Sequence, residues 1–145
     1  MTGCLRLRPL SIDILKRDTV GIQLKMIAEG SYNNSDSQMN THLANKNLLP
    51  LAQPFSDAPW NYAGTETLPN IPTNMVDWVL LEVRNANEKT EIIEKRAAIL
   101  LSDGTIADVA NSDEAVKCYN LTAGDAYYVS IRTVSYTHLR AHETR

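Results

Sequence analysis

Residues 76–83 read Val-Asp-Trp-Val-Leu-Leu-Glu-Val, and this stretch decides the fold. Side chains of a β-strand point alternately to its two faces. Apolar side chains occupy both faces here: Val76, Trp78 and Leu80 on one, and Val79, Leu81 and Val83 on the other. A strand that is apolar on both faces is covered on both. We therefore predict a central strand over residues 76–83, with Trp78 in the core.

The next segment, Ile92–Leu101, is also apolar and runs into Ser102-Asp103-Gly104. Asp-Gly between two apolar runs predicts a hairpin, because glycine readily adopts the positive φ that such turns require. The apolar spacing within Glu88–Leu101 would also fit a helix. A strand is favoured because turn signals recur at intervals typical of strands and because the segment leaves through Asp-Gly.

Other short strands are predicted further from the centre. Val20–Met26 alternates apolar and polar residues, as a half-buried strand does, and the polar run Asn33–Ser37 that follows is typical of a turn. The remaining strands are predicted at Thr105–Val109, Ala115–Tyr119 and Tyr127–Ile131, with a turn at Ala123–Asp125. Short strands with regular turn signals predict an all-β fold, an antiparallel β-sandwich of about seven strands.

A proline-rich segment, Met39–Asn74, separates the first strand from the central one. Its prolines exclude a long helix or a central strand: Pro50, Pro54, Pro59, Pro69 and Pro72. Its apolar residues are too many for a solvated linker: Leu48, Leu49, Leu51, Phe55, Trp60 and Tyr62. We predict a long ordered loop that lies over the core, and long loops of this kind are sometimes functional.

Charge and apolar run length argue against two classes of partner. The net charge of −3 provides no basic field for nucleic acid. Apolar runs such as Ala97–Leu101 are too short to span a bilayer. The two cysteines, Cys4 and Cys118, form neither a disulfide framework nor a metal motif, so Cys118 is predicted to be a small buried hydrophobe. No cofactor is predicted.

Residues 134–145 resemble sequence of technical and not natural origin. Val134–Thr144 reads Val-Ser-Tyr-Thr-His-Leu-Arg-Ala-His-Glu-Thr and resembles the translation of the end adapter used in transposase-based sequencing libraries. Segments of such origin are excluded from fold reasoning. We therefore predict that residues 134–145 are a non-native tail, and set aside His138 and His142, whose i, i+4 spacing would otherwise suggest a metal site.

The body of the chain, from about Val20 to Arg132, resembles a module of large secreted or surface-exposed bacterial proteins. The resemblance rests on a series of short motifs in a fixed order: Gly30-Ser31-Tyr32, Gln53-Pro54-Phe55, Pro59-Trp60-Asn61-Tyr62-Ala63-Gly64-Thr65-Glu66, Asp77–Arg84, Leu101-Ser102-Asp103-Gly104 and Tyr127–Arg132. It implies a bacterial protein located outside the cell or at its surface, whose partners are other domains of the same polypeptide and a cell-surface glycan or protein. In the family the last strand continues into a histidine-rich run, so the departure after Arg132 predicts C-terminal truncation.

Three segments follow from these observations. Residues 1–18 are an N-terminal extension outside the resemblance, in which Asp13 and Lys16-Arg17 interrupt any apolar core of a signal peptide. Residues 19–133 are the β-sandwich module, and residues 134–145 are the tail.

Catalytic and metal sites find little support in the residues of the body. His42 is the single histidine of the body and lies in a polar loop, so a serine or cysteine nucleophile outside that loop would have no histidine to act as its base. The sequence also lacks a Gly-x-Ser-x-Gly motif. Glu82 and Arg84 share a strand face and predict an ion pair. Oxygen donors gather at Asn33–Asp36, and again at Asp103, Asp108 and Asp113, but neither group has the calcium-loop pattern, and turn formation explains both.

The candidate ligand-binding residues are therefore Phe55, Trp60 and Tyr62, with Glu66 beside them. Outward-facing rings would form a platform for stacking against a sugar, whereas inward-facing rings would only pack the loop onto the core. We expect a non-enzymatic extracellular accessory or adhesion module. The alternatives are a carbohydrate-binding module that uses the same aromatics, and a fragment of an enzyme whose catalytic residues lie beyond Arg132.

Overall fold

A computed structural model describes residues 19–135, and these form an antiparallel all-β fold, as predicted. The N-terminal extension 1–18 and residues 136–145 of the tail lie outside the described residues, together with Cys4, His138 and His142. The predictions made for those segments are not addressed by the structure.

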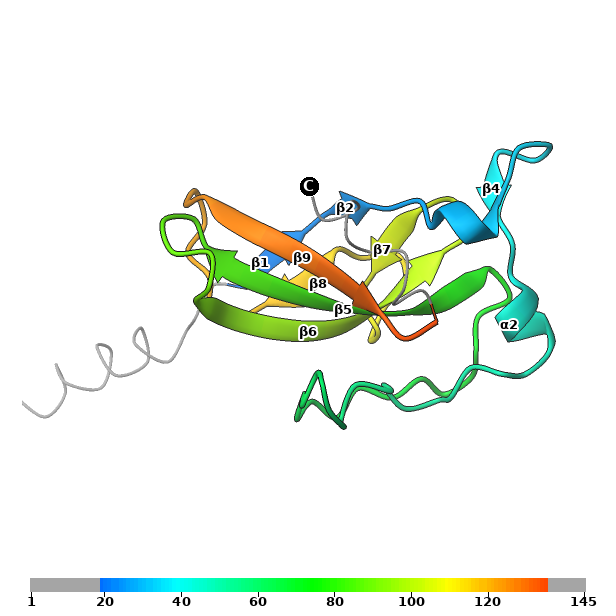
Figure 1. Ribbon diagram of the computed structural model, residues 1–145, viewed down its shortest axis with the longest axis horizontal. Helices are drawn as coiled ribbons and strands as arrows, with labels where there is room; N and C mark the ends of the chain where they lie inside the picture. Colours follow the sequence, from blue (N-terminus) through cyan, green and yellow to red (C-terminus); the bar gives the residue numbers. More distant parts are fainter. Residues whose placement is uncertain (1–18, 136–145) are drawn as a thin grey trace, which may run out of the picture.

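The main sheet has five strands and carries the central segment predicted from the sequence. Its order is β2-β7-β6-β5-β9, with every pair antiparallel (Figure 1). The strands are β2 (Leu24–Lys25), β5 (Met75–Asn85), β6 (Ile92–Leu101), β7 (Thr105–Ala107) and β9 (Tyr127–Thr133). The segment that also fitted a helix is thus the strand β6, and it pairs with β5 along its length.

Two small sheets complete the strands. One pairs β1 (Val20–Ile22) with β8 (Val116–Cys118), and the other pairs β3 (Tyr32–Asn33) with β4 (Gln38–Met39). A single turn of 3-10 helix, η1 (Glu29–Ser31), and a short helix, α2 (His42–Asn45), lie between β2 and β5. Nine strands are present in residues 19–135, two more than the predicted seven.

The difference has two causes. The segment predicted as one strand, Val20–Met26, is divided at Gln23, because its first half pairs with β8 and its second half with β7. Alternation of side chains gives the strand period but not the partner, so it could not reveal this change of sheet. The turn at Asn33–Ser37 also closes a small hairpin of its own, in which Tyr32 lies opposite Met39.

The central strand is covered on both faces, as its sequence predicts. The face predicted for Val76 is wrong, however: Val76 packs on the side of Val79 and Leu81, because the β5–β6 register shifts between Met75 and Asp77. On one face, Trp78 and Leu80 pack with Phe55, Tyr62 and Leu68 from the proline-rich loop. On the other, Val79 and Leu81 pack with Met39, Val116 and their neighbours. All four β5 side chains are fully buried. The loop thus forms a layer of the fold in place of a second sheet on the first face.

Two turns adopt the geometry that their glycines predict. Gly104 has φ +90° and its N–H bonds to the carbonyl of Leu101 at 2.9 Å, which closes the β6–β7 hairpin. Gly124 has φ +91° in the turn before β9. Both turns confirm the predictions from Asp-Gly and Ala-Gly-Asp.

Cys118 is a buried free thiol on β8, as predicted. Burial raises the pKa of this thiol to about 12, and the nearby carboxylate of Glu94 adds to the effect. The group is therefore uncharged at neutral pH and behaves as a small hydrophobe. Nowhere in residues 19–135 is there a helix of the length and apolar character needed to cross a bilayer.

Candidate functional site

The candidate aromatic residues lie on a loop that folds back on itself. Its two limbs are joined by backbone hydrogen bonds from Gln53 to Glu66, from Tyr62 to Phe55 and from Leu68 to Leu51, at 2.8–3.0 Å. The indole Nε1 of Trp78 donates to the carbonyl of Pro50 at 2.8 Å. The loop is consequently ordered and fixed to the sheet, as predicted.

A tight turn at the tip of the loop presents Trp60. The N–H groups of Trp60 and Asn61 both donate to the carbonyl of Asp57, and Asn61 has φ +46°. The ammonium group of Lys95, on β6, donates to the carbonyl of Trp60 at 2.8 Å. A charge-assisted hydrogen bond therefore holds the tip against the sheet.

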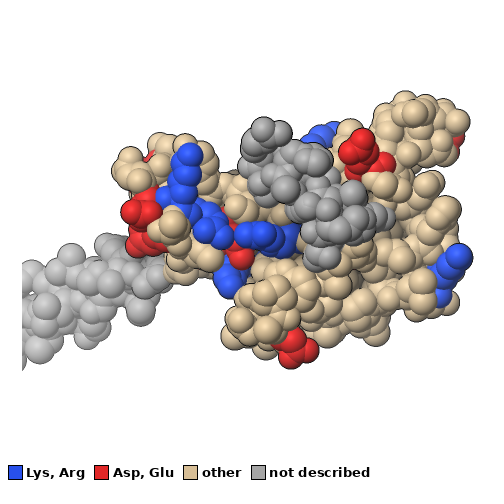
Figure 2. Space-filling model, viewed as in Figure 1, with Lys and Arg blue, Asp and Glu red and all other residues tan. Residues whose placement is uncertain are grey.

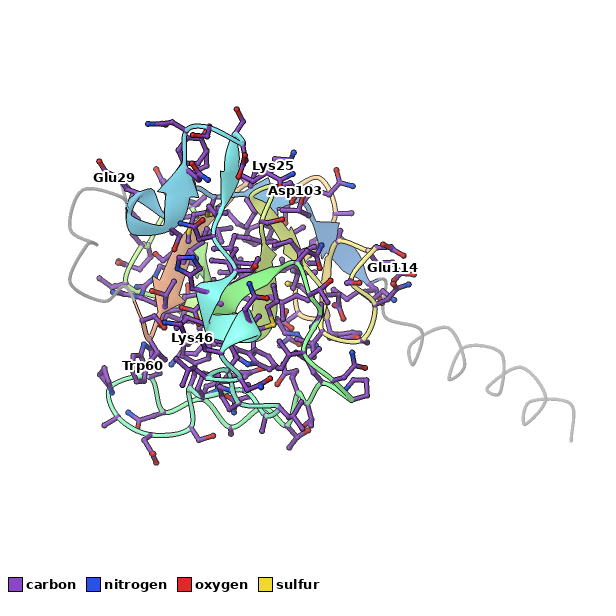
Figure 3. All side chains as sticks on the ribbon, turned by 90° about the vertical axis from the view of Figure 1, so that its right-hand side faces the viewer. Lys25, Glu29, Lys46, Trp60, Asp103 and Glu114 are labelled. Carbon is purple, nitrogen blue, oxygen red and sulfur yellow. The ribbon has the colours of Figure 1, made fainter. Side chains whose placement is uncertain are left out.

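The three rings differ in their burial. Phe55 is 0% exposed and Tyr62 is 8% exposed, and both belong to the core. Trp60 is only partly buried and meets Phe55 edge to face, with ring centroids 5.6 Å apart and planes at 76°. It lies at the margin of the molecule (Figure 3). Phe55 and Tyr62 pack inward, so Trp60 is the ring of the three that offers surface to a ligand.

Glu66, the fourth candidate, lies with Tyr62 in a polar cluster beneath the loop. The Tyr62 hydroxyl donates a short hydrogen bond to the Glu66 carboxylate, and the Arg96 guanidinium lies 3.7 Å from the same oxygen. Burial, reinforced by Glu66, raises the pKa of Tyr62 above its ordinary value. Glu66 Oε2 is buried without a hydrogen-bond partner. The Glu66 side chain is only 12% exposed, so it offers little surface to a ligand. Its contact with Arg96 instead helps to attach the loop to the sheet.

Gly64 makes this cluster possible. A Cβ at that position would lie 2.2 Å from the Tyr62 ring and 2.3 Å from a Glu66 carboxylate oxygen. The carbonyl of Gly64 also accepts a hydrogen bond from the Gln53 side chain at 2.8 Å. The absence of a side chain thus lets Tyr62 and Glu66 meet.

The carboxylates that the sequence offered for catalysis are separated and engaged elsewhere. Asp77 is 3% exposed and its Oδ1 accepts the N–H of Trp78 at 2.8 Å, at an irregularity in the β5–β6 register. Burial raises the pKa of Asp77, against the opposing effect of hydrogen bonding from Ser135 and Trp78. Glu82 pairs with Arg84 at 2.5 Å, which confirms the predicted ion pair. Glu66, Asp77 and Glu82 therefore form no shared acid–base pair.

The oxygen-rich loops behave as turns. The Asn33 side chain bonds to Asp36 and accepts the N–H of Ser35. Asp103 accepts the N–H of Thr105, and Asp108 accepts those of Ala110 and Lys117. Within residues 19–135 no three His, Cys, Asp or Glu side chains are grouped as metal ligands.

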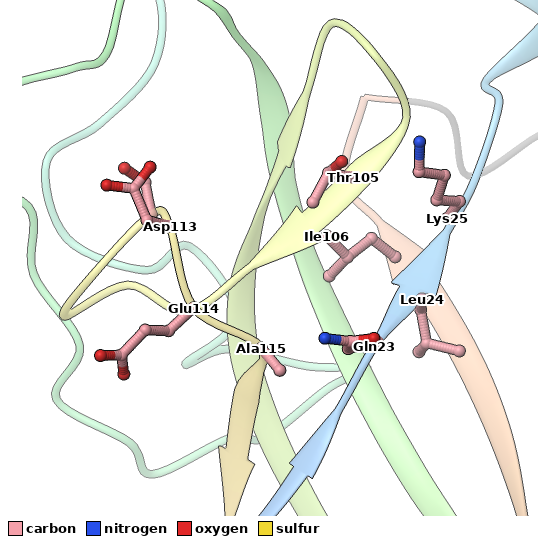
Figure 4. Close-up of a pocket in the computed structure, with 9 residues that line it drawn as sticks. Gln23, Leu24, Lys25, Thr105, Ile106, Asp113, Glu114 and Ala115 are labelled. Atoms are coloured by element: carbon pink, nitrogen blue, oxygen red, sulfur yellow. The ribbon is translucent and has the colours of Figure 1, made fainter.

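Three shallow pockets lie away from the aromatic residues. The first, about 280 Å³, lies between β2, β7 and the loop before β8, and Asp113 and Glu114 extend from that loop away from Leu24 and Ile106 (Figure 4). The second, about 370 Å³, is lined mainly by polar residues, among them His42, and the third, about 570 Å³, is lined by residues that include Leu49, Leu51 and Ile71. None of them includes a residue of the aromatic cluster.

Two residues that contact the candidate site, Lys95 and Arg96, were not predicted from the sequence. They reach the loop from β6, far along the chain, to bind Trp60 and Glu66 respectively. The run Glu94-Lys95-Arg96 within an apolar strand was the available signal, because charged residues inside a sheet strand are rarely without a partner.

Comparisons with known proteins yield no relative. The chain matches no protein-family model and no curated protein, and no solved structure matches it. The resemblance to a secreted bacterial module therefore stays a prediction.

Proposed function

We propose that this chain is a non-enzymatic binding module, of the accessory or adhesive kind, that acts outside the cell within a longer bacterial polypeptide. Its mechanism is the presentation of a rigid surface to a cell-surface glycan or protein. The observation that carries the proposal is the ordered proline-rich loop, which is fixed to the sheet by Trp78 and Lys95 and presents Trp60 at its tip.

Rigidity is what such a module requires. A surface already ordered before binding loses little conformational entropy when a partner docks. The loop's aromatic and polar contacts both serve this order, since Phe55 fills the core and Glu66 ties Tyr62 to Arg96. The carboxylates are engaged in structural contacts, which favours binding over turnover.

The test is a binding screen of the 145-residue chain against immobilised glycans and extracellular matrix proteins, with heat-denatured chain as control. The proposal expects saturable binding to at least one polymer, with no change in that polymer on prolonged incubation. Absence of binding throughout the panel would contradict the proposal, and so would chemical conversion of the bound polymer.

A second candidate, carbohydrate binding through Trp60, is favoured by the partial exposure of that ring. Trp78 is fully buried, so a ligand-induced change in tryptophan emission would report on Trp60. Glycan titration should shift the emission of the natural chain, and Trp60→Phe should abolish the shift. A shift that persists in Trp60→Phe would exclude Trp60 as the contact.

A further inference from the structure

The proline-rich loop covers only part of one face of the main sheet, the part that carries Trp78 and Leu80. The rest of that face is not covered by the loop. In the strand register, Glu82 lies opposite Lys95 on β6 and Ser130 on β9, and Leu80 lies opposite Arg132. Residues directly opposite one another share a face. Figure 2 shows Lys and Arg side chains gathered in a band where β9, β5 and β6 lie side by side. We call Arg84, Lys89, Lys95 and Arg132 the basic band.

The buried carboxylate of Glu82 contacts two members of the basic band, Arg84 and Arg132. Glu82 is 6% exposed, lies 2.5 Å from Arg84 Nη2 and lies 3.5 Å from Arg132 Nε. Arg84 also donates from Nη1 to the carbonyl of Lys89 at 3.0 Å. Glu82 therefore holds both guanidinium groups in place, but a single carboxylate cannot neutralise four cations.

The two lysines have no carboxylate partner among residues 19–135. Lys95 donates to the Trp60 carbonyl, and Lys89 lies over the Tyr128 ring, 4.3 Å from its centroid. Glu88 and Glu91 lie in or beside the β5–β6 turn and remain charged, since they bond to the neutral side chains of Thr90 and Asn85. Neither forms an ion pair with a cation of the basic band.

The basic band is also open to a ligand. The Arg132 side chain is 46% exposed, and Lys89 and Tyr128 are exposed. Neighbouring strands lie about 4.8 Å apart, so the width from β6 to β9 is about 10 Å. From residue 80 to residue 84 the length along β5 is about 13 Å. A surface of this size can contact several acidic groups on one polymer at once.

We propose that the basic band binds an anionic polysaccharide through its carboxylate or sulfate groups. Guanidinium groups recognise such oxyanions by paired hydrogen bonds, and ammonium groups act as point charges. A polysaccharide is favoured over nucleic acid because the proposed function places the ligand outside the cell, and because a chain of net charge −3 lacks the extended basic field typical of nucleic-acid-binding proteins. This inference rests on the proposed binding function and names the ligand class.

The experiment measures the Kd of the full chain for dextran sulfate, polygalacturonate, neutral dextran and single-stranded DNA at several salt concentrations. We expect sulfated or carboxylated polymer to bind, neutral dextran not to bind, and added salt to weaken binding by screening. Binding to neutral dextran at equal strength would overturn the proposal. Tighter binding to DNA than to either acidic polysaccharide would also overturn it, since the basic band would then serve nucleic acid.

Two variants locate the binding on the basic band. Lys89→Glu and Arg132→Gln should each raise the Kd for the acidic polymer, Lys89→Glu by about tenfold because it replaces attraction with repulsion. Arg132→Gln is used because a glutamate at that position would lie beside Glu82. Thermal unfolding of each variant establishes that the fold is kept.

Matched controls change the charge by the same amount at other places on the surface. Lys46 follows α2 at the end of the molecule opposite the β5–β6 turn, where it faces the viewer in Figure 3, and Lys25 lies on β2. Lys46→Glu and Lys25→Gln should leave the Kd within about twofold. Equal loss in the controls would overturn the proposal. If the chain binds another extracellular ligand and neither Lys89→Glu nor Arg132→Gln matters, the binding function stands and the basic band is not its site.

Discussion

At the residue scale, the three rings of the loop differ in burial: Phe55 and Tyr62 pack in the core, and Trp60 is partly exposed. Phe55 is fully buried, so Phe55→Ala should lower the free energy of unfolding by about 3–5 kcal/mol, the usual range for a buried phenylalanine. Trp60 is partly buried, so Trp60→Ala should cost less. Urea unfolding of both variants measures the difference. An equal or larger loss in Trp60→Ala would show that Trp60 is a core residue.

The buried carboxyl of Asp77 predicts a pH-dependent effect. Burial raises the pKa of this group from its ordinary 3.8, so its ionised form costs stability at neutral pH and its protonated form does not. Asp77→Asn keeps the acceptor for Trp78 and removes that cost. We expect a higher Tm than the natural chain at pH 7. The gain should shrink as the pH falls through the raised folded pKa, and it should be absent below the ordinary pKa.

Asp103 provides a control of opposite sign. Hydrogen bonds from Thr105 lower the pKa of Asp103, so its charge contributes stability above the ordinary pKa that is lost as the pH falls through its folded value. Asp103→Asn should therefore lower the Tm at pH 7. A gain from both substitutions at pH 7 would mean that removal of negative charge, and not burial, explains the effect at Asp77.

At the scale of elements, two glycine turns distinguish backbone strain from steric contact. Both Gly104 and Gly124 have positive φ, which costs an L-residue about 1–2 kcal/mol. A Cβ on Gly104 would also lie 3.0 Å from the Met26 carbonyl oxygen, whereas one on Gly124 meets nothing within 4 Å. Gly104→Ala should therefore destabilise more than Gly124→Ala in urea unfolding. Equal losses would indicate that the β2–β7 contact relaxes without cost.

The elements show what the sequence could predict. The long strands β5 and β6 and the Asp103-Gly104 hairpin were predictable, because apolar runs and turn residues act locally. The division of the first strand at Gln23 was not, since it depends on which strand each half meets. The candidate site shows the same limit. Phe55, Trp60, Tyr62 and Glu66 do lie together, but their contacts with Lys95 and Arg96 depend on the register of a distant strand.

At the scale of the whole molecule, the distribution of charge over the surface could not be predicted from the sequence either. A net charge of −3 describes the chain as a whole and conceals the local basic band, which exists only because three adjacent strands place their cations on one face. The proline-rich loop has a matching role, because it covers the apolar half of that face and leaves the charged half open. The packing of the loop on one part of the sheet therefore has two consequences: the loop is held in place, and the basic band stays accessible.

The most direct test of this account is native-state hydrogen exchange of the loop amides. The N–H groups of Gln53, Tyr62 and Leu68 are bonded within the loop, so if the loop is a structural layer they should exchange only when the β5 amides do, through global unfolding. Equal free energies of exchange for the loop and β5 are the predicted result. Loop amides that exchange through a much smaller opening energy would contradict the account, because the loop would then be a detachable cover and not part of a rigid binding surface.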